Sequence, residues 1–286
     1  MIPLMKDGFK IFDSHMHYAG IFKPKKQPFI EYLNNNGIDK AVVNTLNTKA
    51  NLGILKGGAP QEFFRKMKEP DFNIFQDFSE CGQPDHRQVI KLAKKYPDRI
   101  YPFFWYNPND PNDPDQQKGL SLVEKNLDNG FCGVKLQHAM TPFKMKRLYP
   151  LAELLSEKKA PLFIHPTSGI FSTPPTDTFK LAKLAKRFPK LKIIVGHAAY
   201  TMEFAIECLL ATFSCKNVYF ETSVSIPYGI VTFSKIFGPR RVLFGSDSPS
   251  AGPFELEYKK ILALRIPDKA KQQILYRNIS RLLRIR

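Results

Sequence analysis

Short apolar runs that are rich in β-branched and aromatic residues recur along the chain, and each one predicts a buried strand. Continuous apolar runs of this kind are typical of strands that are covered on both faces, as in a parallel sheet. The chain contains eight such runs. They cover residues 9–13, 40–46, 99–105, 131–137, 161–166, 192–198, 218–223 and 241–247.

The stretches between these runs place apolar residues at helical spacing and predict amphipathic helices. Alternation of strands and helices implies parallel strands joined by helical crossovers, and eight such units favour a closed barrel over an open doubly wound sheet. The sequence therefore predicts an α/β protein with a (β/α)8 TIM barrel. The predicted helices cover residues 28–36, 85–96, 119–129, 144–159, 177–188, 201–213, 226–237 and 254–265.

Two segments extend this repeating pattern. Residues 47–84 follow the second strand and are too long for a plain connection, so we expect a lid or substrate loop there. Residues 268–283 have helical spacing after the last strand, and we expect a C-terminal helix that caps the barrel. A chain of 286 residues is within the size range of one barrel, so we expect a single domain over 1–286.

The overall charge narrows the classes of partner. With 43 Lys and Arg against 26 Asp and Glu, the formal net charge is +17, which favours nucleic acid, acidic membranes or anionic substrates. The basic residues are spread over predicted outer helix faces, such as 180–192, and only 277–286 is a dense cluster. We therefore expect a small anionic molecule as the partner rather than nucleic acid.

The location of the protein is predicted from what the sequence lacks. No apolar run approaches the roughly 18 residues of a membrane span, and residues 1–9 do not form a signal peptide. The four cysteines show no CxxC pairing and are expected to be reduced thiols of the interior. We expect a cytoplasmic protein without membrane contact, and a homodimer is compatible with the sequence although no surface marks an interface.

Polar residues gather where the predicted strands end. In a parallel barrel the active site lies at the carboxyl ends of the strands. Alternate residues of a strand share one face, so the first strand could present its three polar residues together. Several histidines and a carboxylate at one barrel mouth suit a borderline divalent ion such as Zn²⁺, with room for a water. The residues at strand ends are Asp13, His15, His17, Lys135, His138, His165, His197, Glu221 and Asp247.

The residues at the strand ends belong to short motifs that follow one another along the chain: FDSHMH, GFCGVKLQ, PLFIHP, IIVGHA, VLFGSDSP and the closing ILYRNISRLL. With these motifs the sequence resembles the amidohydrolase superfamily, in particular the amidohydrolase-2 branch with the aminocarboxymuconate semialdehyde decarboxylase-like enzymes. The resemblance extends over nearly the whole chain, and the DxHxH and GSD elements are its most specific parts.

The resemblance implies a role for each matching position. His15, His17, His165 and Asp247 would hold one divalent metal, Zn²⁺ first and Mn²⁺ as the alternative. His197 would orient or polarise the water that the metal activates.

The remaining strand-end residues receive weaker roles. Asp13 would support the site from behind the ligands, or cap a turn. Lys135 would pair with a carboxylate or attract an anionic substrate, rather than bridge two metals in a carboxylated form. His138 and Trp105 would contact substrate, and Glu221 would support the ligands.

The expected reaction is hydrolysis of a small anionic amide, ester or lactone, in which Asp247 takes a proton from the water and later delivers it to the leaving group. The alternative is nonoxidative decarboxylation of an unsaturated or aromatic acid on the same metal site, because the ligand set does not separate the two reactions. The aromatic residues Trp105, Phe72, Phe75 and Phe78 favour an apolar or planar substrate.

Three further readings remain open. A metal-independent lactonase would keep the histidines without an ion. A TatD-like deoxyribonuclease would use the positive charge, although that group typically has an acidic residue where Lys135 stands. A noncatalytic anion-binding protein would use the basic surface alone, but it would have no need of histidines and an aspartate at one barrel end. Substrate, metal identity and oligomeric state are not determined by the sequence.

Overall fold

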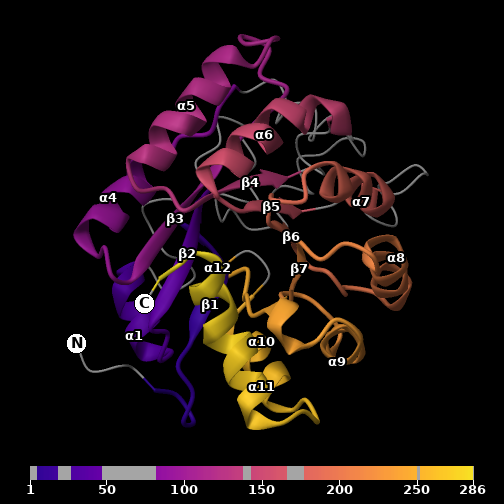
Figure 1. The fold of residues 1–286 in the computed structure, drawn as a ribbon. Helices are drawn as coiled ribbons and strands as arrows, with labels where there is room; N and C mark the ends of the chain where they lie inside the picture. The colour runs from indigo at the N-terminus through magenta and orange to yellow at the C-terminus, as the bar shows by residue number, and fades with distance from the viewer. Residues whose placement is uncertain are drawn as a thin grey trace, which may run out of the picture.

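The computed structural model describes residues 5–18, 27–46, 82–137, 143–165, 177–249 and 252–285. Eight strands form one sheet in chain order, and each pairs in parallel with the next, which confirms the predicted (β/α)8 barrel (Figure 1). The strands are β1 (Phe12–Tyr18), β2 (Lys40–Thr45), β3 (Ile100–Trp105), β4 (Gly133–Gln137), β5 (Leu162–His165), β6 (Ile193–Val195), β7 (Val218–Glu221) and β8 (Val242–Leu243).

The barrel closes where the first strand meets the segment that contains β8. The backbone N–H of Ser14 donates to the Phe244 carbonyl at 2.9 Å, and the backbone N–H of Asp247 donates to the His15 carbonyl at 2.7 Å. These hydrogen bonds join β1, at one end of the sheet, to the residues that directly follow β8, at the other end. We call this contact the seam of the barrel.

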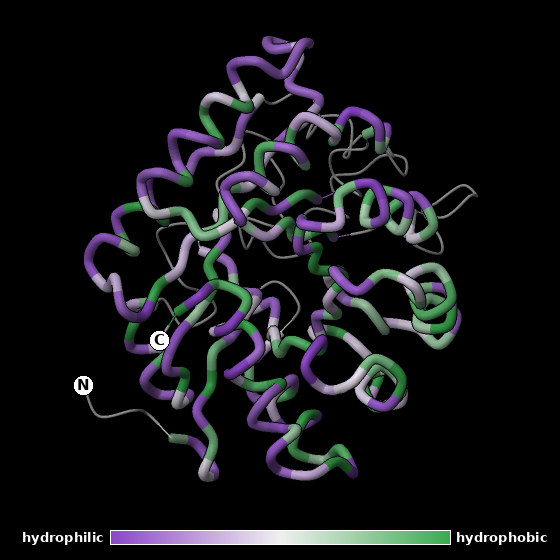
Figure 2. The backbone as a smooth tube through the Cα atoms, in the orientation of Figure 1, coloured by the Kyte–Doolittle hydropathy of each residue, from purple (hydrophilic) through white to green (hydrophobic). Residues whose placement is uncertain are grey.

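Helices surround the sheet as an outer ring (Figure 1). Most of them alternate hydrophilic and hydrophobic residues along the backbone, as amphipathic helices must when one face covers a sheet (Figure 2). They are α1 (Phe29–Asn35), α4 (Arg87–Lys95), α5 (Gln117–Asp128), η1 (Met145–Leu148), α6 (Tyr149–Lys158), α7 (Asp177–Arg187), α8 (Met202–Thr212), α9 (Pro227–Ile236), η3 (Pro239–Arg241), α10 (Phe254–Leu262), α11 (Asp268–Gln272), η4 (Gln273–Arg277) and α12 (Asn278–Leu282).

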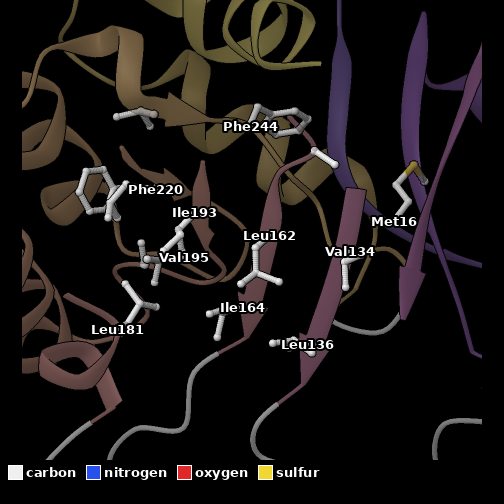
Figure 3. Close-up of a cluster of buried hydrophobic side chains, with 14 of the residues drawn as sticks. Met16, Val134, Leu136, Leu162, Ile164, Leu181, Ile193, Val195, Phe220 and Phe244 are labelled. Atoms are coloured by element: carbon white, nitrogen blue, oxygen red, sulfur yellow. The ribbon is translucent and has the colours of Figure 1, made fainter. Parts of the chain in front are cut away.

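The core has two parts. The larger part lies between the strands and the helices, where residues such as Leu162 and Ile193 pack against helix side chains such as Leu181 (Figure 3). The smaller part fills the barrel interior with one side chain from several strands, including Phe12 and Phe163. Alternate residues of each strand therefore enter different parts of the core, as expected for strands buried on both faces.

The C-terminal helix predicted over 268–283 is present but is not one continuous α-helix. It consists of α11, the π-helical turn η4 and α12. Ile279 of α12 belongs to the interior cluster of the barrel together with Phe12 and Leu243. This segment therefore closes the end of the barrel where the strands begin.

A bulge in β1 decides which of its residues face inward. Phe12 and Asp13 pair with Lys40 and Ala41, but the next pair is Met16 with Val43, so β1 carries an extra residue. Phe12 belongs to the interior cluster, whereas Met16 packs in the outer layer. An inserted residue reverses the alternation of a strand. Before the bulge the even-numbered Phe12 faces the barrel interior, and after it the odd-numbered His15 and His17 do so.

One expectation from the sequence falls outside the described residues, and one concerns the described helices. Residues 47–81 of the expected lid lie outside the described residues, so that expectation stays a prediction. Across the described ranges, none of the helices combines the length and the apolar character needed to cross a membrane.

Candidate metal centre

Two histidines of β1 and an aspartate after β8 bring three donor atoms together. His15 Nε2 lies 3.2 Å from His17 Nε2, and Asp247 Oδ1 lies 3.4 Å from the first nitrogen and 3.1 Å from the second. All three residues are buried. His15 and His17 reach the interior because of the β1 bulge, and Asp247 reaches it because its backbone is bonded to His15 across the seam.

Lys135 of β4 extends its ammonium group into this cluster. Its Nζ lies 2.6 Å from His15 Nε2 and 2.9 Å from His17 Nε2. The same Nζ lies over two aromatic rings, 5.3 Å from the centre of Phe163 and 5.7 Å from that of Trp105. The lysine is fully enclosed, and the imidazoles are its hydrogen-bond acceptors.

The orientation of His15 explains why a cation belongs at this point. Its Nδ1 lies 3.3 Å from the Glu221 carboxylate, which can only accept, so Nδ1 carries the proton and Nε2 presents a lone pair. That lone pair faces the carboxylate oxygen of Asp247, and two acceptors at 3.4 Å repel each other unless a positive charge lies between them. Lys135 supplies that charge here, and a divalent ion with nitrogen and oxygen ligands fits the same donor set.

Glu221 at the end of β7 holds the neighbouring groups in position. Its Oε2 accepts hydrogen bonds from the His197 backbone N–H at 3.1 Å and from the Ser223 hydroxyl at 2.8 Å, in addition to His15. Ser223 in turn lies with its Oγ 3.0 Å from His197 Nδ1, and its carbonyl accepts from the same nitrogen at 3.1 Å. His197 therefore carries its proton on Nδ1 and presents Nε2 to the centre.

His165 at the end of β5 lies beside this group. Its Nδ1 lies 2.8 Å from the Gln137 side-chain amide nitrogen and 3.2 Å from His197 Nε2. The His197 Nε2 is also 3.7 Å from Asp247 Oδ2. Asp247 thus directs Oδ1 toward His15 and His17 and Oδ2 toward His197, which lies beside His165.

Asp13 contacts backbone rather than the imidazole rings. Its Oδ1 accepts from the backbone N–H of His15 at 2.9 Å and from that of Ser246 at 3.1 Å. Burial raises the pKa of its carboxyl group to about 8. Asp13 therefore ties the histidine segment of β1 to the segment after β8.

The ionisation states leave the cluster with a net negative charge. Burial would raise the pKa of Glu221, but hydrogen bonds from the His15 ring and the Ser223 backbone help to lower that pKa to about 2. The pKa of Asp247 is also held well below its ordinary value, against the effect of its burial. Burial lowers the pKa of Lys135 to about 8, against the opposing effect of the two carboxylates. Burial and the nearby Lys135 lower the pKa of both His15 and His17, so both rings are neutral. Two carboxylates against one ammonium favour an added cation.

Aromatic and glycine residues shape the walls of the cluster. The Trp105 ring lies edge-on to His17 at 6.3 Å, and the Phe163 ring lies 4.6 Å from His15. At Gly245 a β-carbon would lie 2.2 Å from Glu221 Oε1, so a side chain there would displace the carboxylate. The absence of a side chain at Gly245 lets Glu221 reach the imidazole.

Two residues of the cluster have backbone conformations that are unusual for non-glycine residues. His197 and Asp247 both have φ of 51°, in the left-handed region. The backbone N–H of His197 donates to the Glu221 carboxylate, and the backbone N–H of Asp247 donates to the His15 carbonyl. These two bonds hold the unusual conformations in place. Such conformations concentrate at functional sites, where surrounding contacts enforce them.

Nearly all of the site residues expected from the sequence lie in the described structure, most of them toward the carboxyl ends of the strands. Asp13 was expected to end the first strand and is instead the second residue of β1, which continues to Tyr18. His138 lies outside the described residues, so its expected role stays a prediction. Ser223 and Gln137 were not predicted, although both occur in the strand-end motifs and are two residues away from a predicted site residue. Their position at a strand end, with the same alternation as Glu221 and Lys135, is the signal that could have identified them.

Comparisons with known proteins agree with this geometry. A family model described as amidohydrolase matches residues 71–285. The search of curated proteins returned no match.

Solved structures share the barrel over nearly their whole length. A TIM-barrel protein from Bordetella bronchiseptica is 19% identical, with a TM-score of 0.72 over 96% of this chain and 98% of the other. The 2,6-dihydroxybenzoate decarboxylase from Rhizobium is 13% identical, with a TM-score of 0.64 over 96% and 99%. The 5-carboxyvanillate decarboxylase from Novosphingobium aromaticivorans, in complex with manganese and a nitrobenzoic acid, is 15% identical, with a TM-score of 0.65 over 97% of both chains. At these identities the likeness establishes the fold.

Proposed function

We propose that this chain, which belongs to the amidohydrolase family and is a metal-dependent hydrolase or decarboxylase, hydrolyses a small anionic amide, ester or lactone. The observation that carries the proposal is the meeting of His15 Nε2, His17 Nε2 and Asp247 Oδ1 within 3.4 Å of one another. These are ligand atoms of the types that Zn²⁺ and Mn²⁺ take in proteins.

In this proposal His15, His17, His165 and Asp247 hold one divalent ion, Zn²⁺ first and Mn²⁺ as the alternative. Glu221 fixes the His15 ring through Nδ1, and such partners behind a ligand orient it and raise its basicity. When bound, the ion would supply a water of lowered pKa and polarise a substrate carbonyl.

His197 and Asp247 are the proposed catalytic residues. Because Nδ1 of His197 is occupied by Ser223, its Nε2 is available to accept a hydrogen bond and orient a nucleophile. Asp247 Oδ2 lies 3.7 Å from this nitrogen, and as the oxygen that faces away from His15 and His17 it is the proposed site for holding a proton before delivery to the leaving group.

Lys135 and Trp105 are the proposed substrate contacts. The Lys135 ammonium would leave its imidazole acceptors for a substrate carboxylate once an ion takes their lone pairs, because both cations use the same nitrogens. The Trp105 ring beside His17 provides a flat apolar surface for the body of the substrate.

Decarboxylation on the same site is the second candidate. Two of the barrel neighbours are decarboxylases of aromatic acids, and one of them binds manganese together with a nitrobenzoic acid. Trp105 and Phe163 would flank a planar ring equally well. In that case the proton held at Asp247 or His197 would be delivered to carbon as carbon dioxide leaves.

The position of Lys135 supports a third candidate, hydrolysis of a lactone without a metal. An ammonium group within 2.9 Å of both imidazoles already fills the role of the cation in the described structure. Full turnover of a lactone by chelator-treated protein, and its loss in Lys135→Met, would favour this candidate over the metal-dependent one.

Metal content is the first test. Protein purified without chelator is analysed for metals as wild type, His17→Ala and Asp247→Ala, with His86→Gln as a matched histidine variant outside the cluster. We expect about one zinc or manganese per chain in wild type and His86→Gln, and loss in the other two. Wild type without metal after resupply, or equal metal in all four proteins, would refute the metal-dependent proposal. Two metals per chain would indicate a carboxylated Lys135.

Metal-loaded protein is then given carboxylate-bearing amides, esters, lactones and aromatic acids. Hydrolysis releases protons from esters and lactones and amine from amides, whereas decarboxylation releases carbon dioxide, so the products separate the candidates. Asp247→Asn serves as the inactive control. Carbon dioxide release alone would replace hydrolysis by decarboxylation.

A further inference from the structure

Helix α8 exposes a row of large apolar residues. Met202, Ile206, Leu210 and Phe213 follow one another at spacings of four, four and three positions, so they share one side of the helix. Their exposed fractions are 40%, 51%, 64% and 67%, rising toward the end of the helix. The α8 backbone is correspondingly hydrophobic along most of its length, in contrast to the alternating pattern of α5 (Figure 2).

The neighbouring helix α9 extends this apolar surface. At the start of α9, a β-carbon on Gly229 would lie 3.3 Å from that of Ala205 on α8 and 2.3 Å from that of Ala199, so the two helices approach closely there. The neighbouring Tyr228 is exposed. At the other end Phe237 lies 6.3 Å from the Phe213 ring. Beside Phe237, Ile236 of α9 is also exposed. We call Met202, Ile206, Leu210, Phe213, Tyr228 and Ile236 the α8–α9 face.

The distribution of charge separates this face from the rest of the molecule. The chain carries 43 Lys and Arg, yet residues 193–215, which include the whole of α8, contain neither. By contrast α7, the preceding helix, has Lys180, Lys183, Lys186 and Arg187 within eleven residues. Two copies of a chain with a net charge of +17 repel each other over most orientations, and the lack of Lys and Arg in residues 193–215 reduces that repulsion where α8 meets a second copy.

The few charges at the edges of the face are arranged with opposite signs at its two ends. Glu203 is exposed in the first turn of α8, and Lys216 is exposed just after its end. If α8 crosses a second α8 in the antiparallel direction, the first turn of each helix meets the last turn of the other. Glu203 of one copy then faces Lys216 of the partner subunit, and the apolar row faces itself, as a two-fold interface requires.

We propose that the α8–α9 face is the interface of a homodimer in which the two α8 helices pack antiparallel around a two-fold axis. Leu210 and Ile206 form the centre of the contact, and the pairs of Glu203 with Lys216 of the partner subunit form its rim. A stable interface buries roughly 800 Å² on each copy, so α9 must contribute together with α8. This inference is independent of the reaction that the barrel catalyses.

The first test measures molar mass by sedimentation equilibrium over about 1–100 μM protein for wild type, Leu210→Glu and Leu122→Glu. Leu122 is an exposed leucine on α5, a helix between β3 and β4, so it is the matched control. We expect a dimer for wild type and for Leu122→Glu. For Leu210→Glu the dimer dissociation constant should rise at least about 30-fold, because a charge would be buried at the centre. A monomeric wild type, or equal weakening by Leu122→Glu, would overturn the proposal.

A charge exchange tests the antiparallel arrangement. Glu203→Lys should weaken the dimer about fivefold, because two like charges then meet at each rim position. The double variant Glu203→Lys/Lys216→Glu should return the dissociation constant to within about twofold of wild type. If the double variant is no tighter than Glu203→Lys alone, the two helices do not cross in this way and the proposed interface is wrong.

Discussion

His86 gives the sharpest prediction because it is a buried, titratable residue outside the metal centre. It lies just before α4, and its ring stacks on Phe104 with centroids 4.2 Å apart. Its Nε2 accepts a hydrogen bond from the backbone N–H of Trp105 at 2.8 Å. Protonation of the ring would replace that acceptor by a donor at a buried position, facing the N–H of Trp105.

The magnitude follows from the shift in its pKa. Burial lowers the pKa of His86 from 6.5 to about 4, so the unfolded chain binds a proton more readily than the folded one. The contribution to stability is therefore complete above about pH 6.5 and is lost as the pH falls toward 4. At pH 5, protonation of His86 shifts the folding equilibrium about 30-fold toward the unfolded state. This factor corresponds to about 2 kcal/mol of lost stability.

The perturbation is His86→Gln, because the amide oxygen can accept from the same N–H but does not titrate. Trp105 is the single tryptophan of the chain and is buried, so its fluorescence during urea unfolding reports on the loss of structure around it. We expect the free energy of unfolding of the wild type to fall by about 2 kcal/mol more than that of His86→Gln between pH 8 and pH 5.

Comparing how the free energy of unfolding changes with pH in the two proteins separates the titration of His86 from other effects of the substitution. Loss of stacking on Phe104 lowers the stability of His86→Gln at every pH, and all other titrating groups are common to both proteins. Parallel pH profiles of the two proteins would show that His86 is protonated as easily in the folded as in the unfolded chain, and the reasoning from burial would then be wrong.

Three further predictions concern the metal centre and the end of the barrel. Gly245→Ala places a β-carbon against Glu221, so the metal affinity should fall about 10- to 100-fold, as measured in competition with a chelator. Unchanged affinity would show that the carboxylate can shift at no cost. Ser223→Ala removes the hydroxyl between Glu221 and His197, so turnover should fall about tenfold while the metal content is retained. Loss of the metal would instead show that Ser223 holds the metal ligands in position. Asn278→Ala leaves the buried Val242 carbonyl and the partly buried Pro239 carbonyl without their donor and should cost about 2 kcal/mol in urea unfolding. A neutral result would mean that water replaces the amide.

The fold could be predicted from the sequence because each strand is an apolar run of its own. The eight runs correspond to the eight strands, and the helices between them begin and end within a few residues of the predicted bounds. The largest differences are at the two ends of the sheet: β8 is two residues long, and β1 continues through His15 and His17 to Tyr18. Pairing partners decide those bounds, and a local pattern does not contain them.

The site was predicted as residue types at strand ends, and the arrangement within it required the structure. The bulge that turns His15 and His17 inward depends on the pairing of β1 with β2. The contact of Glu221 with His15 joins residues 206 positions apart, and the placement of Lys135 between two imidazoles likewise depends on closure of the barrel. No local signal in the sequence specifies such contacts.

The seam of the barrel has a consequence for when the site can exist during the life of the chain. His15 and His17 stand at the first strand and Asp247 after the last, and Ser14 and Phe244, which join these segments, are 230 positions apart. A nascent chain therefore cannot assemble the centre until the segment after β8 has left the ribosome. An ion that binds only the closed form would also stabilise the native state, by about 2.7 kcal/mol at a hundredfold excess over its dissociation constant. Metal supply would then govern how long newly made molecules remain open to proteolysis.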